Sequence, residues 1–287
     1  MASPFDQLAR DPIFVIGAAR SGTTWISDIL AAHPQVARIH ESWLFTQNDG
    51  VGSLFTNAHW PPKPSGLGSL LGRDELVCHV REMVTQIMSH AIQPEHRFIV
   101  EKSPSHAFAI ALICELFPGA LFIHALRDGR DVCVSVRAAA QSWMPAWKMS
   151  FGRSVATSAR AWRDETLYVE NAVKTLGSSI LEIRYEDIHA DPFASYRRIF
   201  DFCGIPYDDS ILQHVHQDTD FAQNYEPGEN KFRRGGRVAD WQRQFSLLDA
   251  LIFNYVAGQR LVELGYEKNR FWLPHRCRQQ INSLIIS

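Results

Sequence analysis

A short run near the N-terminus has the composition of an anion-binding loop. Residues 12–16 (PIFVI) are apolar and predict a buried strand, and Gly17 then permits a tight turn because it has no Cβ. After Gly22 the apolar residues recur with helical spacing. Such a layout points backbone N–H groups and the positive end of a helix at a phosphate. The loop adds one guanidinium and several hydroxyl groups, from Arg20, Ser21, Thr23 and Thr24.

The glycine spacing is that of the nucleoside-triphosphate P-loop, but the polar residues differ. Gly17 and Gly22 stand at the two glycine positions of G-x-x-x-x-G-K-[ST], whereas Thr23 stands where that pattern has lysine. A kinase or ATPase uses this lysine on the β- and γ-phosphates of its nucleotide. The cation here is Arg20, inside the loop. The composition therefore favours a shorter anionic group than a triphosphate.

A second polar cluster follows later strands. Arg127 closes one predicted strand, and Ser135 lies eight residues further on, in the predicted helix. Arginine offers a planar fork of donors to phosphate oxygens, and a hydroxyl can complete such a site. Arg20, Lys102 and Arg127 each follow a strand pattern, and parallel strands end at one edge of a doubly wound sheet. The sequence therefore predicts a single anion-binding active site at that edge.

The elements that must position these residues alternate between strand and helix patterns. Strands are predicted at residues 13–16, 98–100, 120–126 and 180–185, with a partly extended passage at 35–42. Helices are predicted at 25–32, 73–91, 105–117, from 130 onward, and at 155–176, 192–203, 209–216 and 247–264. This alternation favours a three-layer α/β fold, with a P-loop-like parallel sheet flanked by helices on both faces. We expect one domain over residues 1–287, with an irregular, aromatic, lid-like insertion at 43–72 and a nucleotide-covering loop at 223–241.

The run ARSGTTW at residues 19–25 resembles the 5′-phosphosulfate loop of sulfotransferases that use 3′-phosphoadenosine 5′-phosphosulfate (PAPS). Its arginine form is closer to the bacterial and protein-tyrosine members than to the cytosolic members, which have lysine at the Arg20 position. The spacing from Arg127 to Ser135 resembles the family's site for the 3′-phosphate. The resemblance implies a PAPS-binding role for the loop residues Arg20, Ser21, Gly22, Thr23, Thr24 and Trp25.

Two further segments resemble nucleotide-binding motifs of the same family. Tyr185, in the run IRYED, matches a tyrosine that lies near the nucleotide. The run RRGGR at 233–237, followed by Asp240 and Trp241, resembles the loop that folds over the 3′-phosphate and adenine. The cytosolic pattern leaves three residues before Asp-Trp, and this chain leaves four, so the choice among the arginines stays open. The resemblance implies nucleotide contacts from this loop, with Arg233, Arg234 and Gly235 as candidates and Arg237 as a further possibility.

The resemblance also implies a reaction, transfer of a sulfuryl group from PAPS to a hydroxyl, or less readily an amine, without a metal. The implied acceptor is a small molecule, a sugar or a lipid. Such transfer needs a base for the acceptor, positive charge at the oxygen that leaves, and exclusion of water. Arg20, Lys102 and the loop N–H groups can supply the charge, and the aromatic insertion can supply the cover.

Two residues are candidates for the base. Glu41 matches the catalytic glutamate that protein-tyrosine and bacterial members carry soon after the first helix. His106 lies near the position of the histidine that the cytosolic members use. Their Lys-x-His spacing would place that histidine at position 104, which is Pro104 here. We therefore favour Glu41 and keep His106 as the alternative.

Composition excludes several other classes of function. The formal net charge of −2 gives no overall basic field for nucleic acid. Apolar residues make up 46% of the chain and no run is long enough to cross a membrane, which indicates a soluble globular protein. Residues 1–11 lack the pattern of a signal peptide. Because relatives that modify secreted proteins are usually membrane-anchored, we expect a cytoplasmic, bacterial enzyme.

Five cysteines without a C-x-x-C pair and 12 scattered histidines predict reduced, packed thiols and no metal site. Two rival functions fit part of the pattern. A P-loop phosphotransferase would need a lysine at Thr23 and a Mg²⁺-binding acid at a strand end. A nucleotide-dependent binding module without catalysis would have no use for Glu41 and Lys102. The sequence gives neither the acceptor nor the oligomeric state.

Overall fold

The computed structural model describes residues 4–58, 66–220 and 237–274 of the 287-residue chain. The chain divides into two compact units. Unit 1 takes in residues 1–17, 22–125 and 168–219, and unit 2 takes in residues 18–21, 126–167 and 220–287. Each unit has its own hydrophobic core.

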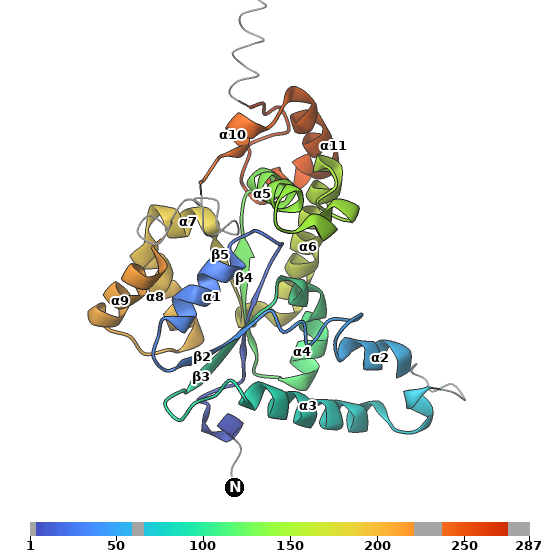
Figure 1. Ribbon diagram of the computed structural model, residues 1–287, viewed down its shortest axis with the longest axis vertical. Helices are drawn as coiled ribbons and strands as arrows, with labels where there is room; N and C mark the ends of the chain where they lie inside the picture. The colour runs from blue at the N-terminus through green and yellow to red at the C-terminus, as the bar shows by residue number, and fades with distance from the viewer. Residues whose placement is uncertain (1–3, 59–65, 221–236, 275–287) are drawn as a thin grey trace, which may run out of the picture. The chain divides into compact units, whose positions relative to one another are not determined.

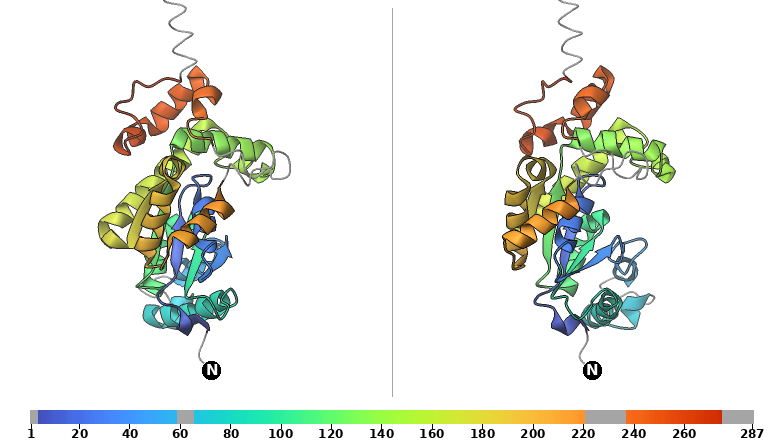
Figure 2. Two further views of the ribbon diagram at one scale, coloured as in Figure 1. Left: turned by 90° about the vertical axis from the view of Figure 1, so that its left-hand side faces the viewer. Right: turned by 60° about the vertical axis from the view of Figure 1, so that its left-hand side comes forward.

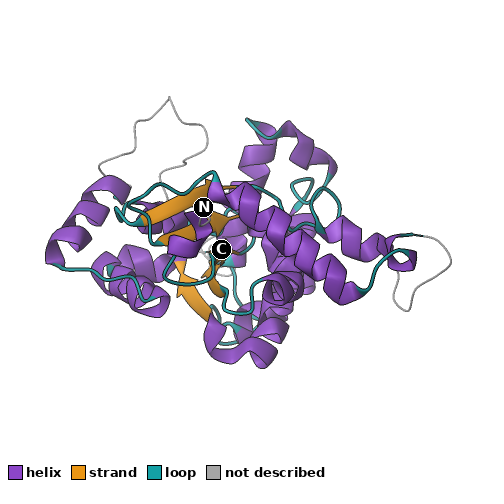
Figure 3. Cartoon of the chain, turned by 90° about the horizontal axis from the view of Figure 1, so that it is seen from below, coloured by secondary structure: helices purple, strands orange, loops and turns teal. Residues whose placement is uncertain are grey.

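Unit 1 is built on a five-stranded sheet in the order β2-β3-β1-β4-β5. Figure 3 shows its strands in orange. β1 pairs in parallel with β3 and β4, and β2 pairs in parallel with β3. Every residue of β1, β3 and β4 is buried, as expected for apolar strands of a parallel sheet covered on both faces. The strands are β1 (Ile13–Ile16), β2 (Val36–His40), β3 (Phe98–Lys102), β4 (Leu121–Leu126) and β5 (Ile180–Arg184).

Helices cover both faces of this sheet (Figure 1). On one face α1 (Thr23–Ala31), α8 (Pro192–Cys203) and α9 (Asp209–Thr219) pack against one another, and α9 runs beside α1 in both views of Figure 2. On the other face, Phe14 and Ile16 of β1 share a core with side chains of α3 (Arg73–Ser89) and α4 (Ile110–Leu116). The predicted three-layer α/β fold is thus confirmed.

Shorter elements complete unit 1. Four of them are short 3-10 helices, and two are short α-helices. They are η1 (Pro4–Gln7), α2 (Gly52–Ala58), η2 (Leu67–Ser69), η3 (Pro104–Ala109), η5 (Gly177–Ser179) and α7 (Tyr185–Ala190).

Unit 2 is helical. Its core gathers aromatic side chains from several helices and the following segment, among them Trp162, Phe245, Phe253 and Trp272. The helix α6 begins in this unit and continues into unit 1. The helices are α5 (Gly129–Gln141), η4 (Pro145–Met149), α6 (Val155–Leu176), α10 (Trp241–Gln244) and α11 (Leu247–Glu263).

The predicted strands are confirmed, and so are the long helices α3, α5, α6, α8 and α11, with α6 and α8 at the predicted bounds. The helix predicted over residues 105–117 is wrong in part, because residues 104–109 form the 3-10 helix η3 and α4 begins only at Ile110. The irregular reading of residues 43–72 is wrong in part, because α2 forms there where Leu54 and Phe55 pack against the core of unit 1. The predicted strand at 180–185 ends one residue early, since Glu186 and Asp187 suit the first turn of α7. The lid-like role of the insertion stays a prediction.

Two of the four free thiols in the described ranges are buried, Cys133 on α5 and Cys203 on α8. Burial raises the pKa of Cys203 to about 12 and raises that of Cys133 well above its usual value. Of the helices described, none combines the length and the apolar character needed to cross a membrane.

Candidate active site

The loop after β1 ends in an uncapped helix N-terminus. Gly22, the N-cap residue of α1, has φ 104°, a left-handed conformation that favours glycine. Glycine has no side chain to cap the helix, and the first N–H to reach back is that of Ile26, 3.1 Å from the Gly22 carbonyl oxygen. The N–H groups of Thr23, Thr24 and Trp25 precede that bond. They therefore present donors, together with the positive end of the helix, to an anion.

Tyr185 lies against this turn. A Cβ at position 22 would come within 2.7 Å of Cδ2 of Tyr185, so only glycine fits without displacing the ring. The Tyr185 ring meets Trp25 edge-on at a centroid distance of 5.3 Å, and the Trp25 indole donates to the Thr219 carbonyl oxygen at 3.1 Å. Three residues that the sequence singled out, Gly22, Trp25 and Tyr185, are thus in direct proximity.

Ser21 carries a buried hydroxyl that lacks a partner. Its side chain is 1% exposed, and Oγ has no hydrogen-bond partner within the described residues. A buried hydroxyl in this state costs free energy, because it has lost water without gaining another partner. An anionic oxygen would satisfy it.

Glu41 and Lys102 meet at the carboxyl edge of the sheet in unit 1. His40 and Lys102 are register partners of β2 and β3, and the Glu41 N–H donates to the Lys102 carbonyl oxygen at 2.7 Å. Nζ of Lys102 lies 2.5 Å from Oε1 of Glu41. Lys102 is fully buried, whereas the side chain of Glu41 is 33% exposed. Burial lowers the pKa of Lys102, although the Glu41 carboxylate opposes this change.

The register of β3 with β1 places Lys102, and with it Glu41, close to the point where the loop after β1 begins. Lys102 lies opposite Val15 of β1, whose chain continues through Ile16 and Gly17, and α1 packs on β3. Lys102 thus lies at the sheet edge from which β1 runs on toward α1, and the convergence of Arg20, Lys102 and Arg127 on one site stays a prediction.

His106 is buried in the core of unit 1 and both its ring nitrogens are engaged. Nδ1 lies 2.7 Å from Oε2 of Glu101, and Nε2 accepts the Phe45 N–H at 3.2 Å. The ring also meets Phe14 and Phe45 edge-on. A histidine without a free nitrogen or exposed surface is not placed to take a proton from an acceptor. These contacts favour Glu41 over His106, and the choice of base stays a prediction.

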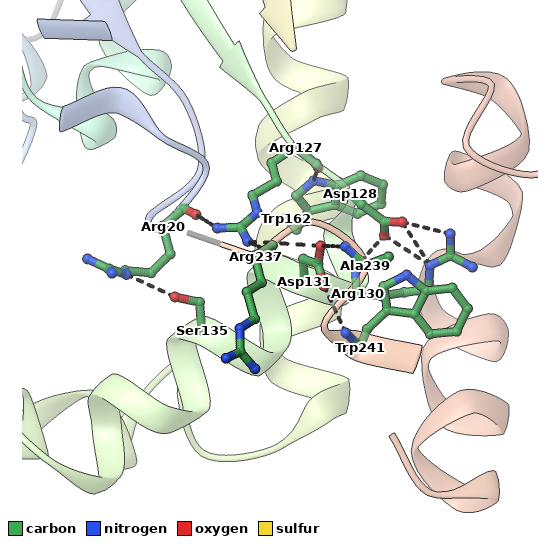
Figure 4. A network of polar contacts seen from close by, with 10 residues as sticks. All are labelled: Arg20, Arg127, Asp128, Arg130, Asp131, Ser135, Trp162, Arg237, Ala239 and Trp241. Atoms are coloured by element: carbon green, nitrogen blue, oxygen red, sulfur yellow. Dashed lines mark hydrogen bonds and ion pairs between the residues drawn. The ribbon is translucent and has the colours of Figure 1, made fainter. Parts of the chain in front are cut away.

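In unit 2, Arg20, Arg127 and Ser135 form one polar network (Figure 4). Nε of Arg20 donates to Oγ of Ser135 at 3.1 Å. The Arg127 guanidinium donates to the carbonyl oxygens of Arg20 at 3.3 Å and of Arg237 at 2.9 Å. Arg20 has a left-handed φ of 73°. The predicted link between the first loop and the Arg127–Ser135 pair is thus present in the structure.

Asp131 binds the backbone at the C-terminal end of the predicted nucleotide-covering loop. Its carboxylate accepts the N–H groups of Ala239 at 2.8 Å and Trp241 at 2.9 Å, and it lies 3.9 Å from the Arg127 guanidinium. Burial raises the pKa of Asp131 to about 6, against the opposing charge of Arg127. Asp131 was not among the residues predicted from the sequence, although its place four residues after Arg127, in the first turn of α5, was a signal. Arg233, Arg234 and Gly235 lie outside the described residues.

Arg130 and Trp162 make further contacts with residues of the network around Arg127. The Arg130 guanidinium pairs with Asp128 at 2.7 Å and lies 3.7 Å over the ring of Trp241. The Trp162 indole donates to the Arg127 carbonyl oxygen at 3.1 Å. A Cβ at Gly129 would come within 2.4 Å of the Trp162 ring, so the glycine is required for this contact.

Comparison with known proteins identifies the family. A model described as "Sulfotransferase family" matches residues 12–209, which is more than half of the chain. The chain belongs to the sulfotransferase family. The match includes all the site residues discussed above except those of the segment after residue 209.

The curated relatives are distant in sequence. An uncharacterized protein of Aquifex aeolicus is 26% identical over 218 residues, which is 72% of this chain and 27% of that protein. Protein-tyrosine sulfotransferase A of Caenorhabditis elegans is 24% identical over 206 residues, 70% of this chain and 52% of that protein. The chain thus spans between about a quarter and a half of the length of these relatives.

A solved sulfotransferase shares the fold. The crystal structure of mouse sulfotransferase SULT7A1 complexed with PAP matches with a TM-score of 0.52 at 18% identity, over 90% of this chain and 87% of that chain. In the described residues of the present chain, no group of three or more His, Cys, Asp or Glu side chains is arranged to hold a metal ion.

Proposed function

We propose that this sulfotransferase transfers a sulfuryl group from PAPS to a hydroxyl of a small molecule, sugar or lipid, with Glu41 as general base. The observation that carries the proposal is the pairing of a buried ammonium, Lys102, with a partly exposed carboxylate, Glu41, at the sheet edge where α1 begins. A cation and a base side by side are the two groups that sulfuryl transfer needs.

The residues present fit the donor. The buried, unpartnered hydroxyl of Ser21 and the N-terminal end of α1, which has no side-chain cap, suit the oxygens of a phosphosulfate. Arg127 and Ser135 suit the 3′-phosphate, since a guanidinium and a hydroxyl are groups that bind phosphate oxygens. The mouse relative of the same fold was crystallised with PAP, the product that PAPS leaves behind, which supports this choice of donor.

Each residue then has a defined task. When bound, PAPS supplies the sulfuryl group and a phosphate leaving group. Glu41 accepts the proton of the acceptor hydroxyl at Oε1 or Oε2, which makes the hydroxyl oxygen a better nucleophile. Lys102 and the N–H groups of the first turn of α1 stabilise the negative charge that grows on the departing oxygen. Tyr185 and Trp25 shape the turn and keep water from it.

A phosphotransferase is the alternative reaction for a loop of this spacing. Thr23 stands where such an enzyme has its phosphate-binding lysine, which argues against it. Melting curves test the choice. PAP should raise the melting temperature, whereas ATP with Mg²⁺ should have little effect. Equal or greater stabilisation by ATP with Mg²⁺ would reject the proposal.

Turnover tests the reaction itself. PAP release from PAPS should depend on an acceptor drawn from a panel of phenols, sugars and lipid alcohols, and should persist in EDTA because no metal is assigned a task. Absence of acceptor-dependent PAP release across the panel, with PAP binding intact, would favour a binding module without catalysis.

A further inference from the structure

A second buried carboxylate, Glu101, precedes Lys102 on β3 and has no task in the proposed reaction. Its side chain is fully buried. Oε1 accepts three hydrogen bonds, from the N–H of Ser42 at 3.1 Å, from Oγ of Ser42 at 2.8 Å and from Oγ of Ser103 at 2.6 Å. Oε2 accepts from Nδ1 of His106 at 2.7 Å. Burial alone would raise the pKa of Glu101, but these hydrogen bonds outweigh it and lower the pKa, so the carboxylate is ionised.

The groups around Glu101 bind four consecutive backbone N–H groups of the segment that follows Glu41. Each acceptor is either Glu101 itself or a side chain that is hydrogen-bonded to Glu101. We call Ser42, Glu101, Ser103 and His106 the Glu101 cluster. The four bonds run from Ser42 to Glu101 Oε1 at 3.1 Å, from Trp43 to Ser103 Oγ at 3.2 Å, from Leu44 to Ser42 Oγ at 3.2 Å and from Phe45 to His106 Nε2 at 3.2 Å.

These contacts determine which ring nitrogen of His106 carries the proton. Because Nε2 accepts the Phe45 N–H, this nitrogen carries no proton, and Nδ1 is the one that donates to Glu101. A neutral amide at position 101 cannot offer acceptors to both Ser103 and His106. Its NH₂ group would force the imidazole to change tautomer and to lose the bond from Phe45. The cluster therefore depends on a carboxylate at position 101.

The segment needs this support because its backbone is strained. Glu41 has φ 48° and Trp43 has φ 52°, left-handed values that residues with a Cβ rarely adopt. Trp43 is 52% exposed, so core packing does not hold it there. The bonds from the Glu101 cluster are what compensates the strain. They set the direction in which the chain leaves β2 and so the direction of the Glu41 side chain.

We propose that Glu101 is a positioning residue for Glu41, and that it acts through the Glu101 cluster on the backbone of residues 42–45. This inference rests on the proposed function, in which Glu41 is the base. The hydrogen bonds of Glu101 go to Ser42, Ser103 and His106. It fixes the base by fixing the strained turn from which the base projects.

The first test uses Glu101→Gln and two kinds of measurement. Amide hydrogen exchange in peptides that contain residues 42–45 should become at least tenfold faster, with little change in peptides from α8. With PAPS and the best acceptor of the panel, kcat should fall by about 10²-fold, since a small misplacement of a catalytic group costs this much, while KM for PAPS changes less than about threefold. Unchanged exchange, or a loss confined to KM, would overturn the proposal.

The second test asks whether Glu101 acts only through Glu41. In a Glu41→Gln background there is no base left to position, so adding Glu101→Gln should lower kcat less than about threefold further. Val84→Ala, a core truncation on α3 away from the cluster, is the control for general destabilisation, and its effect should be the same in both backgrounds. If Glu101→Gln lowers kcat by the same factor in both backgrounds, its role is structural and the proposal is wrong.

A milder variant keeps the test available if Glu101→Gln does not fold. Ser103→Ala removes the hydroxyl that accepts the Trp43 N–H and donates to Glu101. It should therefore show the same pattern, with a kcat loss of about tenfold. Parental kcat in Ser103→Ala, with Glu41→Gln inactive, would reject positioning and leave the proposed function intact. Parental kcat in Glu41→Gln would reject the proposed base and this inference with it.

Discussion

Lys102 and Glu41 form an ion pair in which Nζ lies 2.5 Å from Oε1, with the ammonium fully buried and the carboxylate one-third exposed. The asymmetry matters because the two groups have different tasks in the proposed reaction. The cation is kept from solvent, where its charge acts more strongly, and the base keeps a surface on which an acceptor can approach. The carboxylate also keeps the lysine charged in a place where burial alone would favour the neutral amine.

Glu41→Gln should lower turnover by about 10²–10⁴-fold, the usual contribution of a general base, because glutamine keeps the shape and removes the basicity. The thermal shift with PAP should stay within about 1 °C of the parent shift, since Glu41 is assigned no contact with the donor. PAP release from PAPS measures the first quantity and a melting curve the second. His106→Gln should lower turnover far less than Glu41→Gln, because His106 reaches the base only through the Glu101 cluster. A dead His106→Gln beside an active Glu41→Gln would reverse the assignment.

Lys102→Met should lower turnover strongly while PAP binding stays within about threefold, if the ammonium acts mainly on the departing oxygen. The side chain of methionine keeps most of the buried apolar stem. Isothermal calorimetry with PAP and single-turnover kinetics with PAPS separate the two effects. A loss of PAP affinity equal to the loss of rate would make Lys102 a binding residue only.

The lowered pKa of Lys102 predicts the pH dependence of stability. Between the lowered pKa and the ordinary value of 10.5, the unfolded chain holds a proton on Lys102 that the folded chain has lost. The free energy of unfolding therefore rises with pH across this window, and below the window the buried charge lowers it by a constant amount. Urea unfolding of parent and Lys102→Met should show a difference, parent minus variant, that increases toward pH 10.5. A difference that stays flat or decreases would contradict the shift.

Arg127→Ala should remove most of the preference for PAP over AMP. The two nucleotides differ in the 3′-phosphate, and one charge-assisted hydrogen bond to it is worth about 1.5–3 kcal/mol. In the parent, PAP should raise the melting temperature far more than AMP does. Arg243→Ala, at an arginine of α10 that is assigned no role, is the matched control and should keep the preference. Equal stabilisation by PAP and AMP in the parent would remove PAPS as the donor.

Gly129→Ala should destabilise the protein by about 1–3 kcal/mol, the usual cost of overpacking. Its Cβ would lie 2.4 Å from the Trp162 ring, whose indole holds the Arg127 carbonyl oxygen. PAP binding should weaken as well, because Arg127 would shift with the tryptophan. At Gly72 the nearest atom to a new Cβ is 3.6 Å away, so Gly72→Ala is the control and should change the free energy of unfolding by less than about 1 kcal/mol. Similar costs for the two variants would show that the Trp162 contact is not tight.

The sequence predicted what depends on local pattern. Strand and helix periodicities gave the sheet and placed Lys102 and Arg127 at strand ends. The role of His106 could not be predicted in this way, because its partners Glu101 and Phe45 reach it through the pairing of β2 with β3 and the loop that follows. The same holds for Asp131, whose partners lie more than a hundred residues away on the chain. Left-handed backbone at a glutamate leaves no signature in residue type.

The two buried thiols lie in different units, Cys203 in unit 1 and Cys133 in unit 2. Only a thiolate reacts readily with an alkylating reagent, and burial has raised the pKa of both groups. Alkylation of Cys133 or Cys203 therefore requires the surrounding helices to open, whereas alkylation of the exposed Cys78 requires no such opening. The chain thus contains a natural probe of local unfolding in each unit. Timed alkylation followed by peptide mass spectrometry would reveal whether the two cores melt in one cooperative event or in sequence.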